Sequence, residues 1–380
     1  MAFDKPTRNA LAKMVAACRE RLTADISDQL QSAFGLYPDG TRLDVARTEA
    51  DKRATAELRA LLDYFLASDA SSAKNPQNAY QRLVREIGFT TLNRLAALRL
   101  SEERGLVIEC VRRGMDSDGF RLFDRVANGA LGTRYATYRA FIEGMYDELA
   151  LELPALFDRH HPHSHVFPGE IALNETLALL NDPDLARREI WKQDETIGWI
   201  YQYYNDPTER KKMRDESQAP RNSRELAVRN QFFTPRYVVE FLTDNTLGRI
   251  WFEMRGGETT LAEVCRYLVK PTSALTSPPA PLLGGEGSRK LKDPRDLKVL
   301  DPACGSGHFL LYAFDLLLYI YEEAWADADL PLSMETGTLL REDYADLESL
   351  RRAVPELILR HNLHGIDIDP RAAQRNVSMI

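Results

Sequence analysis

A glycine-rich turn between an apolar strand and an apolar helix is the feature of this sequence best suited to chemistry. Residues 297–301, LKVLD, alternate apolar and polar side chains and lead into PACGSG at 302–307. The apolar run HFLLYAFDLLLYIYEEAW follows at 308–325. This order predicts the first unit of a doubly wound α/β domain. Gly305 and Gly307 lack a Cβ, so a ligand can lie against the backbone of the turn.

The charge at this turn indicates which ligand it would hold. A dinucleotide fingerprint needs a third glycine where this chain has Leu310, and the lysine of a phosphate-binding loop is absent. Asp301, at the strand end, would repel a pyrophosphate and attract a cation. S-adenosylmethionine carries a sulfonium and an ammonium group, so we expect it to be the ligand.

A second acidic strand end lies in NLHGIDIDP at 362–370. An acidic residue at the end of the second strand commonly hydrogen-bonds ribose hydroxyls. Asp367 is our candidate for this role, and Ile368 is placed to pack on the adenine ring. Asp369 is the alternative, although an aspartate before a proline is often only a turn former.

The segment NQFFTPRYVVEFL at 230–242 predicts the start of a helix. Thr234 is the expected N-cap, with Pro235 at the first helical position. The free N–H groups of a helix N-terminus suit a ligand carboxylate, such as that of the methionine moiety. The residues expected on the buried face of this helix are Tyr237, Val238, Phe241 and Leu242.

The rest of the chain must position these residues. Apolar residues recur at three- and four-residue steps from Leu11 to Ile26 and from Tyr138 to Leu149, which predicts a mainly helical region at 1–208. A segment with seven Lys/Arg and four Asp/Glu at 209–230 predicts a basic linker over 209–229, with phosphate contact as the alternative role. Five prolines and three glycines at 271–296 predict a disordered insertion.

Two further segments have competing interpretations. The cluster HHPHSH at 160–165 predicts a solvated loop rather than a metal site, because no carboxylate or cysteine lies at useful spacing. The segment IGWIYQYYND at 197–206 predicts a buried helix face, with stacking on nucleic-acid bases as the alternative.

Composition limits the classes of protein. The net charge is −8, so any nucleic-acid binding would depend on local basic patches. Four distant cysteines without a CxxC pair argue against a zinc site and a disulfide framework. The longest apolar run, 309–321, has 13 residues and contains Asp315, too short for a membrane span. We expect a cytoplasmic protein without membrane contact.

Taken together, FFTP, DPACGSGHFLL and GIDIDP resemble the gamma-type N6-adenine DNA methyltransferases. The resemblance is closest to the PglX-type methyltransferases of BREX phage defence and to the related DISARM methyltransferase. It implies a Rossmann-like S-adenosylmethionine-dependent domain over 230–380, which ends after its second strand and is therefore incomplete. Double-stranded DNA and other phage-defence proteins are the implied partners.

The resemblance also assigns cofactor-binding roles, although it assigns no catalytic residue. Catalysis in the family depends on an NPPY or NPPF motif that holds a flipped adenine, and no NPP occurs in this sequence. We expect a truncated or split methyltransferase, with a separate chain supplying the missing half. The alternatives are a non-catalytic helical interaction or DNA-binding module with a vestigial cofactor half-site, and an S-adenosylmethionine enzyme acting on RNA or protein. The implied cofactor-binding residues are Thr234, Asp301, Ala303, Gly305, Gly307, Asp367 and Ile368.

Overall fold

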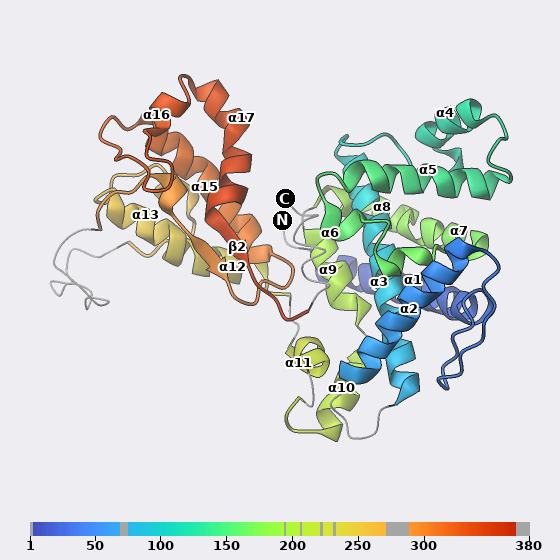
Figure 1. Cartoon of the computed structure of the whole chain (residues 1–380). Helices are drawn as coiled ribbons and strands as arrows, with labels where there is room; N and C mark the ends of the chain where they lie inside the picture. Colours follow the sequence, from blue (N-terminus) through green and yellow to red (C-terminus); the bar gives the residue numbers. More distant parts are fainter. Residues whose placement is uncertain are drawn as a thin grey trace. The chain divides into compact units, whose positions relative to one another are not determined.

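The chain forms two compact units in a computed structural model (Figure 1). The first unit comprises Met1–Phe233 with Ile368–Ile380, and the second comprises Thr234–Asp367. The structure describes residues 3–68, 75–193, 195–205, 207–220, 223–230, 233–270 and 289–369.

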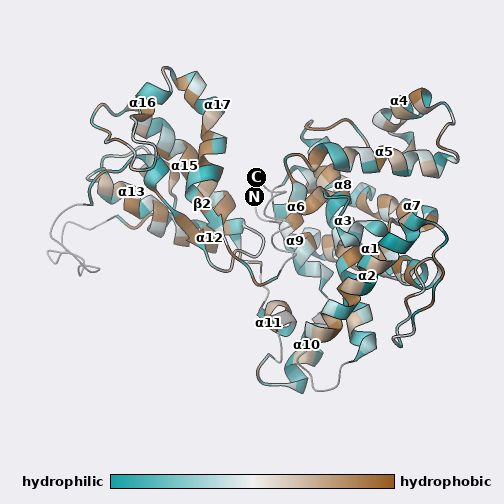
Figure 2. Ribbon diagram, in the orientation of Figure 1, coloured by the Kyte–Doolittle hydropathy of each residue, from teal (hydrophilic) through white to brown (hydrophobic). Residues whose placement is uncertain are grey.

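The secondary-structure elements described in the first unit are all helices, apart from an isolated antiparallel bridge between Leu36 and Arg42, which confirms the predicted mainly helical N-terminal region. Figure 2 shows apolar and polar residues mixed around its helices, as expected for helices that bury one face. Its α-helices are α1 (Lys5–Ser32), α2 (Glu49–Ser68), α3 (Pro76–Glu103), α4 (Asp118–Ala127), α5 (Arg134–Leu149), α6 (Pro154–Phe157), α7 (Glu170–Leu180), α8 (Pro183–Arg187), α9 (Glu195–Tyr204), α10 (Pro207–Glu216) and α11 (Ser223–Asn230). Its 3-10 helices are η1 (Gly114–Asp116), η2 (Pro162–His165) and η3 (Ile190–Lys192).

Helix α3 is the centre of this unit. Asn75 caps it by accepting a hydrogen bond from the backbone N–H of Gln77 at 3.0 Å. Every residue from Ile87 to Leu100 is buried, so other elements surround this part of α3 on all sides. Helices α1, α2 and α9 pack against it.

The segment predicted as a buried helix face at 197–206 is confirmed as one by α9. Ile197, Ile200 and Tyr204 are buried in the core of the first unit. Gly198 lies against the ring of Phe233, and a Cβ added to Gly198 would lie 2.3 Å from Cε2 of that ring. Glycine is therefore required at this point of the helix.

Two sequence predictions in the first unit are changed by the structure. The solvated loop predicted at 160–165 is confirmed for His160 and His161, which are exposed. It is wrong for Pro162–His165, which form η2, because His163 is buried and His165 Nε2 contacts Glu57 Oε2 at 2.7 Å. Where we predicted a basic linker at 209–229, helices α10 and α11 form and group with the first unit.

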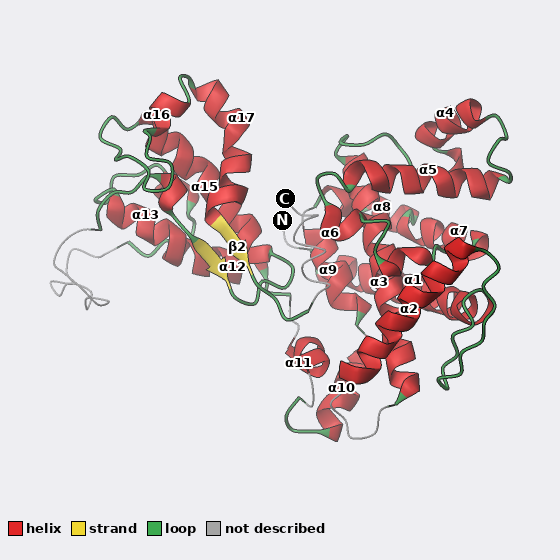
Figure 3. Cartoon of the chain, in the orientation of Figure 1, coloured by secondary structure: helices red, strands yellow, loops and turns green. Residues whose placement is uncertain are grey.

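The second unit contains two parallel strands, β1 (Val299–Asp301) and β2 (Leu363–Gly365), shown in yellow in Figure 3. Val299 pairs with Leu363, and Asp301 pairs with Gly365. The long apolar helix α15 (His308–Ala326) follows β1 and packs on both strands, as the sequence pattern predicts. The remaining elements of this unit are α12 (Arg236–Thr243), η4 (Asp244–Gly248), α13 (Arg249–Met254), α14 (Leu261–Val264), η5 (Pro294–Asp296), α16 (Leu340–Asp343), α17 (Leu347–Leu357) and η6 (Ile358–Asn362).

Asn362 joins the three parts of the second unit that carry the site. Its Nδ2 donates to the carbonyl oxygens of Pro294 and Leu297, each at 2.7 Å, and these residues precede β1. Its Oδ1 accepts from the Tyr321 hydroxyl of α15 at 3.0 Å. Asn362 is fully buried and immediately precedes β2, so this amide fixes where the two strands meet.

The predicted insertion at 271–296 is partly contradicted. Residues 271–288 lie outside the described part of the chain, but the end of the segment is ordered structure. Arg295 is 2% exposed and its guanidinium binds both carboxylate oxygens of Asp293, at 2.8 and 2.9 Å. This buried ion pair ends the irregular region before β1 begins.

No helix among the described residues is both long and apolar enough to cross a membrane.

Replacing Gly198 by alanine should lower the melting temperature of the first unit. The added methyl group would overlap the Phe233 ring, and overpacking of this kind costs about 1–3 kcal/mol. Gly144→Ala in α5 is the matched control, because a Cβ there meets nothing within 4 Å and alanine favours the helix. Equal melting temperatures for the two variants would contradict the packing role of Gly198.

Replacing Asn362 by leucine should destabilise the second unit by roughly 2–4 kcal/mol, because three buried polar partners lose their hydrogen bonds. Hydrogen exchange of the α15 amides measures this opening, and exchange of the α3 amides is the internal control. Unchanged protection of α15 would show that Asn362 does not hold the strands.

Candidate cofactor site

The glycine turn at 302–307 links β1 to α15 and has a backbone that only glycine adopts readily. Gly305 has φ 49° and Gly307 has φ 72°, both in the left-handed region. Among the described residues, a Cβ added to Gly305 would meet only the Ala303 carbonyl oxygen, at 3.9 Å. The described part of the chain therefore leaves the space beside Gly305 open, as required for a ligand that lies against the backbone.

Hydrogen bonds continue the strand pairing beyond β1 and β2 and bring the two acidic strand ends together. The Ile366 N–H donates to the Asp301 carbonyl oxygen at 2.9 Å, and the Cys304 N–H donates to the Ile366 carbonyl oxygen at 3.0 Å. Gly365 permits this approach, because a Cβ there would lie 3.1 Å from Cys304 Sγ. The turn and the segment after β2 are thus held as one structure.

Asp367 closes this structure. Its Oδ2 accepts a hydrogen bond from the Gly305 N–H at 2.7 Å, so one carboxylate oxygen holds the glycine turn in place. The sequence suggested Asp367 only as a contact for the ribose of the cofactor. The structure shows a positioning contact to the turn that sequence spacing does not reveal.

Asp301 has the least satisfied carboxylate of the site. Its Oδ1 accepts from the Ala303 N–H at 3.1 Å, whereas its Oδ2 is buried and has no hydrogen-bond partner among the described residues. Burial raises the pKa of Asp301 above its usual range, and the negative charge of Asp367 raises this pKa further. A cation placed beside both carboxylates would relieve both effects.

Thr234 approaches the same region through its backbone. Its carbonyl oxygen lies 2.9 Å from His308 Nδ1 at the start of α15, and the carbonyl can only accept, so Nδ1 carries the proton. The expectation that Thr234 is the N-cap is wrong, because Pro235 occupies the cap position of α12 and no side chain caps this helix.

The predicted buried face of this helix is also wrong. Tyr237, Phe241 and Leu242 are exposed, whereas Val239 and Thr243 are buried. Helix α12 packs against α15. The apolar spacing therefore predicted the helix correctly and its packed face incorrectly.

The sequence did not identify His308 as a residue of the site, although it directly follows the turn in GSGH. It is buried, with 4% of its surface exposed, and joins the FFTP segment to the glycine turn. A polar residue at the first position of an otherwise apolar helix is the signal that could have identified it.

Ile368 and Asp369 group with the first unit. Ile368 is 53% exposed, so about half of its side chain is open to solvent or to a ligand. Asp369 is buried, and its Oδ2 accepts from the Tyr201 hydroxyl of α9 at 2.8 Å. Asp369 is the alternative candidate for the ribose contact, and this hydrogen bond already uses one of its carboxylate oxygens within the protein.

Six of the seven predicted residues therefore belong to the second unit: Thr234, Asp301, Ala303, Gly305, Gly307 and Asp367. The arrangement combines an open backbone turn with two neighbouring carboxylates, which suits a cationic ligand that also carries hydroxyl groups. No group of three or more His, Cys, Asp or Glu that could hold a metal ion occurs within the described residues.

Comparison with known proteins gives two relatives, whereas no family model matches. An adenine-specific methyltransferase BrxX of Escherichia coli O9:H4 (strain HS) is 29% identical over 323 residues, which cover 78% of this chain and 24% of that protein. An adenine-specific methyltransferase PglX of Lacticaseibacillus casei (strain Zhang) is 34% identical over 195 residues, covering 48% of this chain and 13% of that protein.

The chain thus spans at most about a quarter of the length of either relative. The similarity extends well beyond the short motifs, because one match covers more than three quarters of this chain. By these matches the chain is a relative of the PglX-type adenine-specific methyltransferases, as its motifs predict.

Proposed function

We propose that this chain carries the S-adenosylmethionine-binding part of an adenine-specific DNA methyltransferase. The reaction would be methyl transfer to adenine N6 in double-stranded DNA, within a phage-defence system such as BREX. The observation that carries this proposal is the buried, unpartnered Oδ2 of Asp301 beside the open glycine turn. The names of the two relatives support the same activity.

The residues present fit this cofactor. A buried carboxylate oxygen without a partner is unfavourable unless a ligand supplies a donor or a positive charge, and S-adenosylmethionine supplies both. Asp301 would face its cationic methionine end, with the backbone of Ala303, Gly305 and Gly307 lining the contact. When bound, the cofactor supplies an activated methyl group.

Asp367 has a second task in this proposal. Its Oδ2 accepts from the Gly305 N–H, and this bond would hold the carboxylate beside the glycine turn for the ribose contact proposed for it. Thr234 would contribute through the segment that His308 fixes, and Ile368 would cover the adenine ring. We further propose that β1, α15 and β2 are the beginning of a Rossmann-like domain, in which ligands bind at the carboxyl ends of the strands.

None of these residues is assigned to methyl transfer itself. The family's adenine-holding NPP motif does not occur in this sequence, so the proposal for this chain is cofactor binding and positioning. Sequence-specific reading of DNA is likewise assigned to no residue.

Asp301→Asn should weaken S-adenosylmethionine binding by about tenfold or more, because the side-chain shape is kept while a charge-assisted contact is lost. Titration calorimetry of the whole chain measures this change. Asp329→Asn is the matched control, since Asp329 is an exposed aspartate of the same unit. Equal affinity of Asp301→Asn and wild type would remove the basis of the proposal.

The same substitution should stabilise the cofactor-free protein at neutral pH. Because the pKa of Asp301 is raised on folding, its ionisation opposes folding, and this effect grows as pH rises through the raised pKa. The melting temperature of Asp301→Asn should exceed that of wild type at pH 7, and the difference should vanish at a pH below the unfolded pKa of about 3.9. If Asp301→Asn melted at a lower temperature than wild type at pH 7, the inference that the ionised Asp301 carboxylate destabilises the folded protein would be wrong.

A further inference from the structure

A small cavity in the first unit is lined by α3, by α5 and by the segment between α6 and α7. Its volume is about 20 Å³, slightly more than the roughly 10–15 Å³ that one water molecule needs. One water molecule or one small anion therefore fits, and a larger ligand does not. The polar side chains of its wall are Thr91 and Arg94 of α3, Glu143 and Tyr146 of α5, and Arg159 and Ser164.

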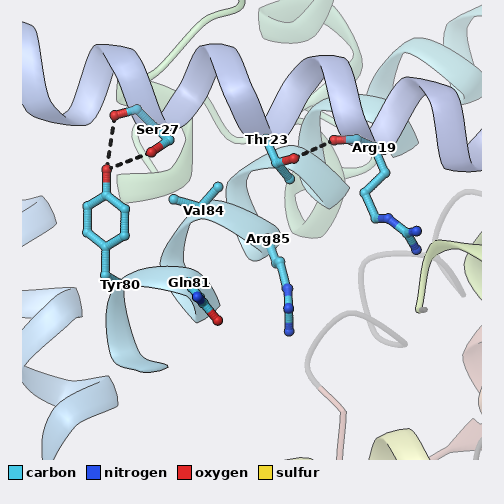
Figure 4. A pocket seen from close by; sticks show the side chains of 7 residues that line it. All are labelled: Arg19, Thr23, Ser27, Tyr80, Gln81, Val84 and Arg85. Carbon is cyan, nitrogen blue, oxygen red and sulfur yellow. Dashed lines mark hydrogen bonds between the residues drawn. The ribbon is translucent and has the colours of Figure 1, made fainter. Parts of the chain in front are cut away.

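A larger cavity, of about 310 Å³, is lined by residues of α1 and α3 (Figure 4). Polar groups at both of its ends are bound within the protein. The Tyr80 hydroxyl donates to the Ser27 carbonyl oxygen at 2.9 Å, and Arg19 Nη1 donates to the Tyr204 carbonyl oxygen at 2.6 Å. These contacts join helices to one another, and we assign no ligand to this larger cavity.

Arg94 is a buried cation in the wall of the small cavity. It is 6% exposed, and it donates from Nε to the Leu156 carbonyl oxygen at 2.6 Å and from Nη2 to the Asp158 carbonyl oxygen at 2.9 Å. Among the described residues, no carboxylate forms an ion pair with Arg94 and no hydrogen bond engages its Nη1. Burial lowers the pKa of Arg94, although the more distant Asp158 carboxylate favours the charged form.

The carboxylate in the wall already has cationic partners. Glu143 Oε1 accepts from Arg139 Nε at 2.8 Å, and its Oε2 accepts from Arg159 Nη1 at 3.3 Å. Arg159 Nε also lies 2.7 Å from Asp147 Oδ1. Because two guanidinium groups and one carboxylate line the cavity, its wall carries an excess of positive charge.

Thr91 adds a hydroxyl donor beside Arg94. It is 8% exposed, and its Oγ1 makes no hydrogen bond to a described residue. The Ser164 hydroxyl differs, because it already donates to the Asp158 carbonyl oxygen at 2.8 Å. A buried charge is unfavourable unless it is paired. An anion would pair the Arg94 guanidinium, whereas a water molecule would leave its charge uncompensated.

We propose that this cavity binds one halide anion, held by Arg94 Nη1 and the Thr91 hydroxyl. The bound anion would join α3 to α5 and to the segment between α6 and α7, and it would stabilise the folded first unit increasingly as the chloride concentration rises. The cofactor residues are in the second unit, so this proposal holds whether or not the chain binds S-adenosylmethionine.

The test is the melting temperature of the first unit, measured on the whole chain in sodium chloride and in sodium gluconate at equal ionic strength. Gluconate is too large for the cavity, so chloride alone should raise the melting temperature, by at least about 2 °C at saturation. Arg94→Gln should abolish this rise. Arg125→Gln, which changes an exposed arginine of α4, is the control and should keep the full rise.

A second variant guards against misfolding, because Arg94→Gln also loses two hydrogen bonds to the backbone. Thr91→Val keeps the shape of the side chain and removes only the hydroxyl. It should fold and should lose about half or more of the rise in chloride.

Bromide locates the anion directly. In crystals of the whole chain grown in sodium bromide, an anomalous difference peak should lie within hydrogen-bond distance of Arg94 Nη1. Water alone in the cavity of these crystals, or equal melting temperatures in chloride and gluconate, would overturn the proposal. A bromide peak without a chloride-dependent melting temperature would show an adventitious ion only. A rise in chloride that Arg94→Gln and Thr91→Val both retain would place the anion elsewhere and would equally overturn the proposal.

Discussion

The amide of Asn362 is the constraint on which the second unit depends. It is fully buried and uses both amide donors and its acceptor. These three hydrogen bonds hold the segment before β1, the start of β2 and one side of α15 together. Because Asn362 fixes the register of the two strands where β2 begins, Asp301 and Asp367 come close together at the carboxyl ends of the strands. The candidate site is thus a consequence of a polar contact at the opposite end of the strands.

Helix α15 connects this constraint to the rest of the unit. Its Tyr312 hydroxyl donates to the buried Asp244 at 2.8 Å, and its Glu323 accepts from Trp251 Nε1 at 2.7 Å. Burial raises the pKa of Tyr312, and the carboxylate of Asp244 raises it further, so the hydroxyl keeps its proton and remains a donor. These contacts hold the helices on either side of Asp244 against α15, near the segment that presents Thr234.

The first unit uses a related arrangement of polar contacts around a helical core. Helix α3 is surrounded on all sides from Ile87 to Leu100, and α9 meets it through aromatic rings, with Phe89 and Tyr204 centroids 5.2 Å apart. The Tyr204 hydroxyl and carbonyl then bind α3 and α1 while the ring packs. The segment that the sequence predicts as a buried helix face therefore also joins α1 to α3 through polar contacts.

The sequence by itself determined the local features. Periodicity predicted the helices from Leu11 and Tyr138, and the strand–turn–helix pattern located the glycine turn, because these signals depend only on near neighbours in the chain. The resemblance carried by the motifs was confirmed by the two relatives.

Tertiary structure alone decided which groups meet. It placed the Gly305 N–H on Asp367, left Asp301 Oδ2 without a partner, and turned Val239 rather than Phe241 toward the core. It also ordered the buried pair of Asp293 and Arg295 inside a segment whose composition predicts disorder. Such contacts join residues far apart in sequence or depend on the packed face of a helix, and neither composition nor spacing contains that information.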